Sequence, residues 1–228
     1  LNKASLIIVL ARVFRKELLM WGVRTPIELS TTKVDDKMLL GFNVYQRNGR
    51  IKNILYLARV EKAKGIYETL KTYELLKSIY PYLKLTIVGD GKELISVRKY
   101  VEDEKLTDVY IKGGLKGIDL IEEFRKADIY SSFSYGEGMP TAVLEAMAFG
   151  LPVFTRNVGG LIDFFENGKM GYITDSMDPK DFADAISSYI EDVKLTKATS
   201  LYNYEYARKH FMASFVAVSI EKQLKKVI

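Results

Sequence analysis

The chain has 228 residues, of which 48% are hydrophobic, so it is large enough for one large domain or one domain with part of a second. It contains no cysteine and one histidine, which excludes a disulfide framework, a thiolate metal site and a histidine-rich metal site. The net charge of +5 favours anionic partners such as phosphates, nucleotides or an acidic membrane surface, but a mildly basic soluble protein explains it equally well.

No apolar run approaches the roughly 20 residues that span a bilayer, and the first ten residues lack the pattern of a signal peptide. We therefore expect a cytoplasmic protein. The first residue is Leu1 rather than Met, from which we expect a piece of a longer protein.

The first 50 residues contain one predicted strand and one predicted helix. Leu6–Leu10 (LIIVL) is typical of a short buried strand, and Val13–Trp21 has helical spacing that Gly22 ends. Thr25–Asn48 is polar and rich in turn-forming residues, and we expect an irregular linker there.

From Asn53 onward, predicted strands and helices alternate regularly. The predicted strands are Ile54–Ala58, Leu83–Val88, Val109–Ile111, Ile129–Phe133, Val153–Thr155 and Gly171–Thr174. The predicted helices are Gly65–Ile79, Glu93–Glu104, Asp119–Lys126, Thr141–Phe149, Leu161–Glu166, Pro179–Glu191 and a final helical region over Leu201–Ile228. This alternation predicts an α/β fold with a parallel sheet that helices cover on both faces. Such sheets bind ligands beyond the carboxyl ends of their strands, so residues just after strands are the candidates for a site.

Arg59, Lys64 and Gly65 follow the first strand of this alternating region. An arginine fork and a mobile lysine can hold a phosphate, and the start of the following helix also favours an anion. Two cations in a short loop are, however, more often solvated surface.

Glu137 and Glu145 form a second candidate, with seven residues between the two carboxylates. Pro140 suits the start of a helix, whose free amide groups could hold a diphosphate. Glu145 lies about one turn inside that helix, in a nearly continuous apolar run formed by Val143, Leu144, Ala146, Met147 and Ala148. An isolated carboxylate there is unfavourable without a partner, which favours a functional role over that of an exposed helix residue.

A glycine pair, Gly159-Gly160, follows a later strand and is equally compatible with a plain turn and with close approach to a ligand. Gly89-Asp90-Gly91 resembles the beginning of a dinucleotide-binding fingerprint, but the third glycine is absent, so we do not expect NAD binding. The last lysines, Lys222, Lys225 and Lys226, could meet anionic lipid headgroups, although a solvated helix face explains them better.

Together these motifs resemble the C-terminal domain of family-4 (group 1) retaining glycosyltransferases of the GT-B fold, over about residues 53–195. The segments that carry the resemblance are Leu57–Gly65 (LARVEKAKG), Ile87–Gly91 (IVGDG), Lys112–Gly114 (KGG), Ala127-Asp128, Ser134–Pro140 (SYGEGMP), Leu144–Val153 (LEAMAFGLPV) and Asn157–Gly160 (NVGG). The resemblance implies a Rossmann-like domain, one half of a GT-B fold, with a small remnant of the other half at the N-terminus.

In catalytic terms, the resemblance implies that Arg59 and Lys64 bind the donor diphosphate and stabilise the departing nucleotide diphosphate. It implies that Glu137 binds sugar hydroxyls near the anomeric centre. Because negative charge develops on the leaving phosphate, cations placed beforehand and a helix N-terminus would lower the barrier. Relatives of this kind retain the anomeric configuration and usually use no bound metal, and we expect neither a metal nor a cofactor here.

The implied donor-binding residues are those around the diphosphate, the sugar and the nucleoside. In this reading Glu145 accepts from the ribose hydroxyls, and the loop near Lys112 receives the base. The set comprises Gly65, Lys112, Gly138, Met139, Pro140, Thr141 and Glu145. Met139-Pro140 stands where many relatives carry Phe-Gly, which should alter the shape of the sugar pocket.

For domain organisation we expect residues 1–24 to be a remnant of the N-terminal acceptor domain and 25–50 to be a linker. Residues 51–198 would form the donor-binding domain, and 199–228 a helical segment that crosses back towards the acceptor domain. The expected function is transfer of a hexose from a UDP- or GDP-sugar to a glycan or lipid-linked acceptor, in the synthesis of surface polysaccharide or glycolipid.

The expected partners are therefore the nucleotide sugar, an acceptor held by the absent acceptor domain and the inner face of a membrane, without nucleic acid. We expect this piece alone to bind a nucleotide sugar weakly and to transfer little. Two alternatives remain open: a non-catalytic nucleotide-binding module, and a sugar-nucleotide epimerase of the same fold, for which no clear acid/base residue is found.

Overall fold

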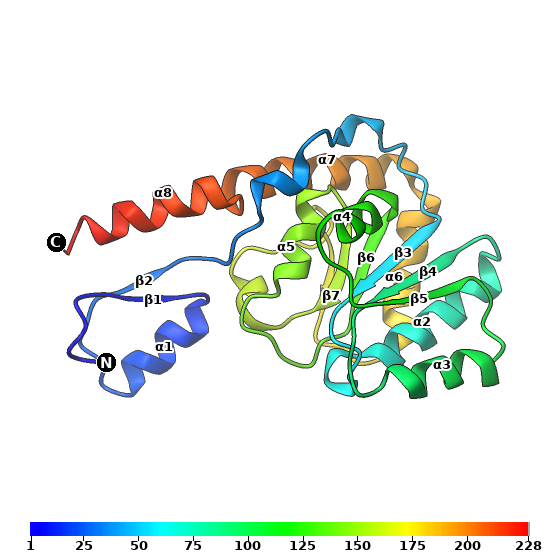
Figure 1. Ribbon diagram of the computed structural model, residues 1–228, viewed down its shortest axis with the longest axis horizontal. Helices are drawn as coiled ribbons and strands as arrows, with labels where there is room; N and C mark the ends of the chain where they lie inside the picture. The colour runs from blue at the N-terminus through cyan, green and yellow to red at the C-terminus, as the bar shows by residue number, and fades with distance from the viewer. Residues whose placement is uncertain (228) are drawn as a thin grey trace.

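Most of the chain forms a parallel sheet with helices on both faces, in residues 44–210, which we call the sheet unit (Figure 1). The computed structural model describes residues 1–227. Six parallel strands pair in the order β5-β4-β3-β6-β7-β8. They are β3 (Asn53–Leu57), β4 (Lys84–Val88), β5 (Val109–Gly113), β6 (Ile129–Ser132), β7 (Val153–Arg156) and β8 (Gly171–Thr174). The chain order reverses between β3 and β6, so these neighbours form the switch point of the sheet.

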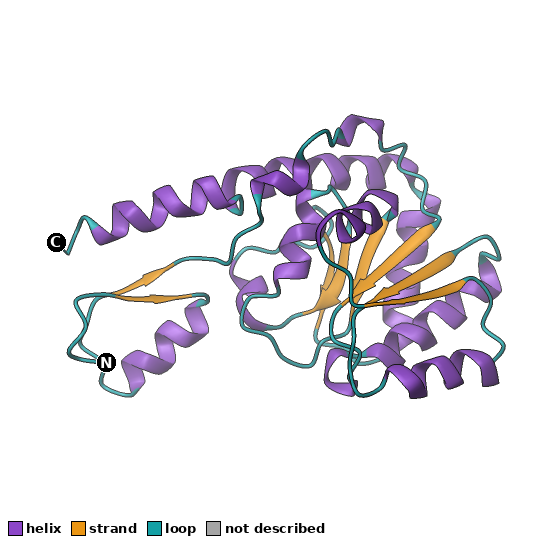
Figure 2. Ribbon diagram, in the orientation of Figure 1, coloured by secondary structure: helices purple, strands orange, loops and turns teal. Residues whose placement is uncertain are grey.

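Helices cover both faces of this sheet, as Figure 2 shows. On one face lie α2 (Ile66–Ile79), α3 (Leu94–Asp103) and α6 (Pro179–Glu191), and on the other lie α4 (Gly117–Lys126), α5 (Thr141–Ala148) and α7 (Val193–His210). Each face has its own apolar core, and the central strands β3, β6 and β7 are buried on both sides. The predicted α/β fold is therefore confirmed, with most predicted elements present within a few residues of their expected bounds.

A smaller unit, residues 5–29, precedes the sheet unit, and we call it the N-terminal unit. It contains β1 (Ile7–Val9), α1 (Arg12–Met20) and β2 (Ile27–Leu29), with β1 and β2 paired in parallel. The first strand and the helix match the prediction. The expectation of irregular structure throughout Thr25–Asn48 is wrong at β2, and this segment also contains the short 3-10 helices η1 (Asp36–Leu39) and η2 (Val44–Gln46).

The C-terminal region is a pair of helices that returns from the sheet unit to the N-terminal unit (Figure 1). Helix α7 begins at Val193, eight residues before the predicted start, and α8 (Ala213–Leu224) follows after a break at Phe211-Met212. The last residue of the predicted helix, Ile228, lies outside the described residues. The expected boundary at residue 198 falls inside α7.

Two stretches of chain connect the units side by side, and they are hydrogen bonded to each other. The Val34 amide donates to the Phe211 carbonyl at 2.8 Å, and the Ala213 amide donates to the Val34 carbonyl at 2.8 Å. Farther along α8, Gln223 Nε2 donates to the Leu29 carbonyl at 2.8 Å. Hydrogen bonds therefore join the linker to the break between α7 and α8, and they join α8 to β2 of the N-terminal unit.

Arg47, at the point where the chain enters the sheet unit, is hydrogen bonded to the ends of two of its helices. Its guanidinium donates to the carbonyls of Phe149 (2.7 Å), Ala127 (2.6 Å) and Phe124 (3.1 Å), at the ends of α5 and α4. A cation is favourable at a helix C-terminus, where carbonyl groups lack partners. Burial lowers the pKa of Arg47 to about 10, which leaves the guanidinium charged at neutral pH.

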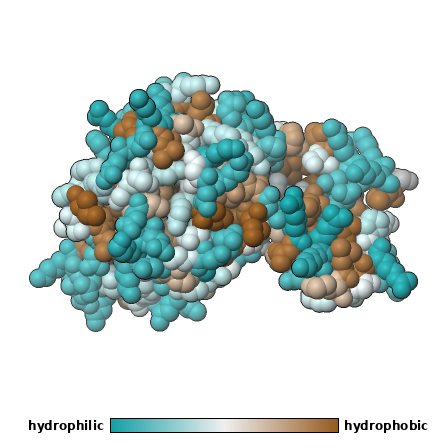
Figure 3. All heavy atoms as spheres, turned by 180° about the vertical axis from the view of Figure 1, so that it is seen from behind, coloured by the Kyte–Doolittle hydropathy of each residue, from teal (hydrophilic) through white to brown (hydrophobic). Residues whose placement is uncertain are grey.

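Large apolar side chains are exposed on the sheet unit, on the N-terminal unit and on α8. Seen from behind, brown surface gathers on the N-terminal unit and where it meets the sheet unit, with smaller areas elsewhere (Figure 3). The end of α1 contributes Leu19, Met20 and Trp21, and Trp21 is 72% exposed. Within residues 1–227, no helix is both long and apolar enough to cross a membrane.

Candidate functional site

The candidate site is a cavity of about 180 Å³ at the carboxyl ends of β3 and β6, at the switch point of the sheet. Open α/β sheets bind ligands at this place, because the loops after two neighbouring strands separate there. The loop after β3, the loop after β6 and the start of α5 form the wall. The lining residues are Leu57, Ala58, Arg59, Lys64, Tyr130, Ser132, Ser134, Glu137, Pro140, Thr141, Ala142, Val143 and Thr155.

The loop after β3 presents Arg59 and Lys64 differently. Arg59 is 68% exposed and its guanidinium lies 3.1 Å from Glu61, whereas Lys64 is only 15% exposed. Gly65 ends this loop with φ of +66°, and a Cβ there would lie 2.3 Å from Cβ of Phe133. The glycine is required because the backbone is left-handed and because the two loops touch at this point. Gly65 thus positions Lys64 against the loop after β6.

Lys64 and Glu137 form an ion pair inside the cavity wall. Lys64 Nζ lies 2.5 Å from Glu137 Oε1, and Ser134 Oγ donates to the same oxygen at 2.6 Å. The two side chains are 73 residues apart in sequence and meet because β3 and β6 are neighbours in the sheet. A cation and a carboxylate are thus held together with little exposure to water, where their electrostatic effect is stronger than at the surface.

Helix α5 begins beside this ion pair without a side-chain cap. Pro140 is its N-cap residue and no side chain accepts a hydrogen bond from its first turn. Among the described residues, the amides of Thr141 and Ala142 have no hydrogen-bond acceptor. Uncapped amides and the positive end of the helix dipole together can bind an anion.

The glycine pair packs against the site loop. Gly159 has φ of +59°, and a Cβ there would lie 2.3 Å from the Gly138 carbonyl. The Gly160 amide donates to that carbonyl at 2.8 Å, and the Met139 side chain lies against Gly160. The pair opens the 3-10 helix η4 (Gly159–Asp163), which replaces the predicted helix Leu161–Glu166 and starts two residues earlier. The glycine pair therefore makes its close approach to the loop that carries Glu137.

Glu145 lies one turn inside α5, with its carboxylate largely buried. Among the described residues, no donor bonds to this carboxylate, and burial raises its pKa to about 7. Removal from water disfavours the charged form when no partner compensates. Glu145 thus lies in the apolar helix that the sequence predicts, and its role in binding stays a prediction.

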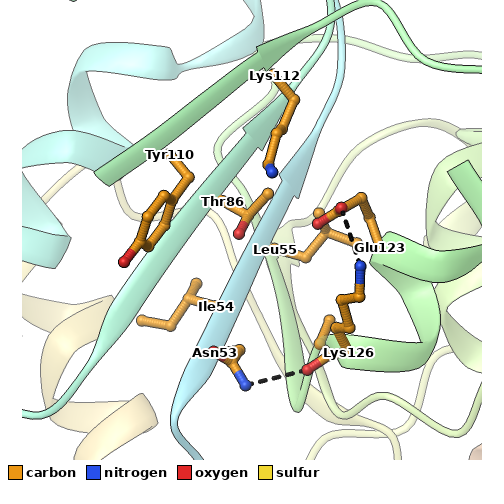
Figure 4. A pocket seen from close by; sticks show the side chains of 9 residues that line it. Asn53, Ile54, Leu55, Thr86, Tyr110, Lys112, Glu123 and Lys126 are labelled. Carbon is orange, nitrogen blue, oxygen red and sulfur yellow. Dashed lines mark hydrogen bonds and ion pairs between the residues drawn. The ribbon is translucent and has the colours of Figure 1, made fainter. Parts of the chain in front are cut away.

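Lys112 lies apart from the other predicted site residues. It is on β5, in a groove of about 190 Å³ on the face of the sheet next to α4. Figure 4 shows its side chain above Thr86, with Glu123 and Lys126 of α4 across the groove. The loop after β5 turns towards Asp90, since a Cβ on Gly114 would lie 2.2 Å from Asp90 Oδ2.

The structure therefore gathers most of the predicted residues and leaves one outside. Arg59, Lys64, Glu137, Pro140 and Thr141 line one cavity. Gly65, Gly138 and Met139 belong to the loops that form it, and Glu145 lies behind its wall in α5.

Sequence reasoning missed four polar residues of the cavity, Tyr130, Ser132, Ser134 and Thr155. Their one available signal was their place within a predicted strand or directly after one.

A six-stranded sheet in this order, with cations and a carboxylate at its switch point, defines a Rossmann-like domain with a candidate site for an anion. The sequence profile of the family described as glycosyl transferases group 1 matches residues 42–208. The chain therefore belongs to the group 1 glycosyl transferases.

Characterised relatives cover the same region. A D-inositol 3-phosphate glycosyltransferase of Paenarthrobacter aurescens (strain TC1) is 32% identical over 147 residues, covering 62% of this chain and 36% of the relative. A poly(glycerol-phosphate) alpha-glucosyltransferase of Bacillus subtilis (strain 168) is 27% identical over 162 residues, covering 70% of this chain and 24% of the relative. The chain thus spans about a third or less of the length of these relatives.

Solved structures share the fold. The pneumococcal O-GlcNAc transferase GtfA, in complex with UDP and GlcNAc, superposes with a TM-score of 0.80 at 21% identity, covering 99% of this chain and 46% of GtfA. HepE of Anabaena, in complex with UDP-glucose, gives a TM-score of 0.79 at 19% identity, covering 98% of this chain and 64% of HepE. The fold is that of GT-B glycosyltransferases.

Proposed function

We propose that this chain is the donor-binding part of a retaining hexosyltransferase, and that it binds a nucleotide-diphosphate sugar at the switch point of its sheet. One observation carries the proposal: a partly buried lysine, a carboxylate and an uncapped helix start line the same cavity. Family membership supports transferase chemistry, and the UDP and UDP-glucose complexes of GtfA and HepE support a UDP-sugar as the donor.

The diphosphate would bind between the loop after β3 and the start of α5. Arg59 is exposed enough to reach a phosphate, and Lys64 would exchange part of its contact with Glu137 for a phosphate oxygen. The free amides of Thr141 and Ala142 would donate hydrogen bonds to the remaining phosphate oxygens. As the bond to the anomeric carbon breaks, these groups would stabilise the negative charge that develops on the leaving phosphate.

The sugar and the ribose would be bound by different carboxylates. Glu137 lines the cavity and would accept hydrogen bonds from sugar hydroxyls. Glu145 would accept from the ribose hydroxyls, which would supply the donors that its buried carboxylate lacks among the described residues. No step in this proposal uses a bound metal or cofactor, because the cations of the chain take that role.

The acceptor is proposed to be a glycan or lipid-linked molecule that the rest of the protein binds. A lipid-linked acceptor would bring the enzyme to the cytoplasmic face of a membrane. Lys222 of α8 and the exposed Phe215 are placed on one helix where such a contact is feasible.

Calorimetric titration with UDP and with GDP tests the proposal. The unmodified chain should bind one of them, and Arg59→Ala should weaken that affinity about tenfold or more, because a charge-assisted hydrogen bond to phosphate is lost. Glu145→Ala should weaken it as well. Unchanged affinity in both variants would sink the assignment.

Arg50→Ala is the matched control for the charge. Arg50 is exposed and lies three residues before the amino end of β3, whereas the cavity is at the carboxyl end of that strand. The substitution changes the net charge by the same amount as Arg59→Ala. An equal loss of affinity in both variants would indicate a general electrostatic effect rather than a phosphate site.

A further inference from the structure

We infer that Ser134 is a positioning residue for sugar recognition, because its hydroxyl fixes one oxygen of Glu137 and leaves the other for the ligand. This inference rests on the proposed function of the cavity. It adds a residue outside the set of cations and carboxylates, and it concerns specificity for the sugar rather than affinity for the nucleotide.

Only one of the two oxygens of the Glu137 carboxylate has hydrogen-bond partners among the described residues. Both of its protein partners bind Oε1: Ser134 Oγ at 2.6 Å and Lys64 Nζ at 2.5 Å. Among the described residues, Oε2 accepts no hydrogen bond, although the side chain lines the cavity. One oxygen is therefore anchored, and the other is the acceptor available to a sugar hydroxyl.

Ser134 is suited to hold this carboxylate because it is buried and its neighbours in sequence contact the loop after β3. The residue is 2% exposed. The next residue, Tyr135, donates its amide to the Ala63 carbonyl at 3.0 Å, and the preceding Phe133 packs against Gly65. The hydroxyl thus sits between the two loops, fixed by backbone contacts on both sides.

The ion pair alone would not keep Glu137 in place while a donor is bound. Lys64 is the cation proposed to move towards the diphosphate, and that movement weakens its contact with Oε1. The neutral Ser134 hydroxyl has no comparable attraction to phosphate and stays on the carboxylate. Ser134 would therefore be the restraint that persists in the donor complex, when the orientation of Glu137 matters.

This assignment predicts a separation between nucleotide and sugar affinity. Titrations would compare UDP with UDP-glucose, UDP-galactose and UDP-N-acetylglucosamine, or GDP with GDP-mannose if GDP is the nucleotide that binds. Ser134→Ala should leave the affinity for the free nucleotide within twofold. It should reduce the additional affinity that the sugar provides by about tenfold, which is the scale of one hydrogen bond to a charged group.

Two further variants make the test specific. Ser131→Ala removes a buried hydroxyl of β6, the strand that precedes Ser134; this hydroxyl has no hydrogen-bond partner among the described residues, and its loss should change neither affinity. Ser134→Cys keeps the shape of the side chain with a weaker donor, and it should show a smaller loss of sugar affinity; it also serves if Ser134→Ala does not fold.

A double-mutant cycle with Glu137→Ala tests whether Ser134 affects sugar affinity through Glu137. If Ser134 acts through Glu137, Ser134→Ala should cause no additional loss of sugar affinity in the Glu137→Ala background. An additional loss there, an equal loss for nucleotide and nucleotide sugar, or no loss at all would overturn the inference.

The two proposals fail separately. If the unmodified chain binds the nucleotide but the sugar adds no affinity, the assignment of Ser134 is wrong and the nucleotide site remains. If neither UDP nor GDP binds, the proposed function itself is wrong.

Discussion

The sheet unit and the N-terminal unit are both built from parallel strands and helices, but they are held together in different ways. The sheet unit has two apolar cores, one on each face of six strands. The N-terminal unit has two strands of three residues, a helix with no buried residue, and a core of Val9, Val23 and Ile27. Two short strands bury too little apolar surface to be stable alone, so this unit depends on its contacts with α8 and η4.

Units of the same architecture can therefore be stabilised by their own apolar core or by contacts with other parts of the chain. The amide of Arg12, at the start of α1, donates to Asp163 of η4 at 2.7 Å. That acceptor comes from 151 residues away, because Ala11 provides no side-chain cap. In the sheet unit, α6 is capped by its own Asp178. We therefore expect the two units to respond unequally to comparable substitutions.

The largest effect should come from the interior of the sheet. Leu85→Ala truncates a fully buried side chain of β4 and should lower the free energy of unfolding by about 3 kcal/mol, measured by urea denaturation. The matched change Ile27→Ala in the N-terminal unit should accelerate hydrogen exchange in β1 and β2 and leave the main transition almost unchanged. An equal loss of global stability in both variants would show one cooperative unit and end the distinction.

The second effect concerns Glu145, whose carboxyl has a pKa of about 7 in the folded protein against 4.5 ordinarily. Between these pH values the folded state holds more protons than the unfolded state, so the free energy of unfolding falls as pH rises from 4.5 to 7. Glu145→Gln should therefore stabilise the chain by about 3 kcal/mol at pH 8 and by nearly nothing at pH 4.5. Urea unfolding at both pH values measures this, with the exposed Glu102→Gln as control; a gain independent of pH would contradict it.

A smaller effect is expected at the junction between the units. Asp163→Ala removes the acceptor from the start of α1 and should reduce the local stability of that helix by about 1 kcal/mol. Hydrogen exchange of the α1 amides should report the change while exchange in β3 and β4 stays the same. Asp103→Ala, which removes an exposed carboxylate from α3, provides the comparison. Faster exchange throughout the sheet unit would refute a purely local role.

The smallest effect is expected at α8. Gln223→Ala removes one hydrogen bond to the Leu29 carbonyl and should cost about 0.5–1 kcal/mol, confined to β2 and α8. Exchange of the amides in these two elements is the measurement. No change in either element would mean that other contacts hold α8 against the N-terminal unit.

The regular part of the fold could be predicted from the sequence because strand and helix periods are strong there. Strand β2 could not, since three residues after Pro26 carry no period and pair with β1 only in the folded chain. The first half of α7 was hidden for another reason. Its buried face is polar, with Thr196, Thr199, Ser200 and Asn203 at helical spacing. The buried face of this part of α7 therefore lacks the apolar stripe by which a helix is recognised in a sequence.

The candidate site was predictable in its charged residues and not in its geometry. Arg59, Lys64 and Glu137 stand out by type and by their place after strands. The pairing of Lys64 with Glu137 depends on β3 and β6 being neighbours, which follows from the strand order and not from local sequence. Ser134 carries no signal of its own, because one serine after a strand is ordinary.

The double connection between the units has a mechanical consequence. A single stretch of chain would let the N-terminal unit swivel freely about its bonds. Here two stretches run together and are joined by two hydrogen bonds through Val34, next to the break between α7 and α8. Twisting would separate these stretches and break both bonds, whereas bending across them would not. The joint should therefore bend more easily than it twists.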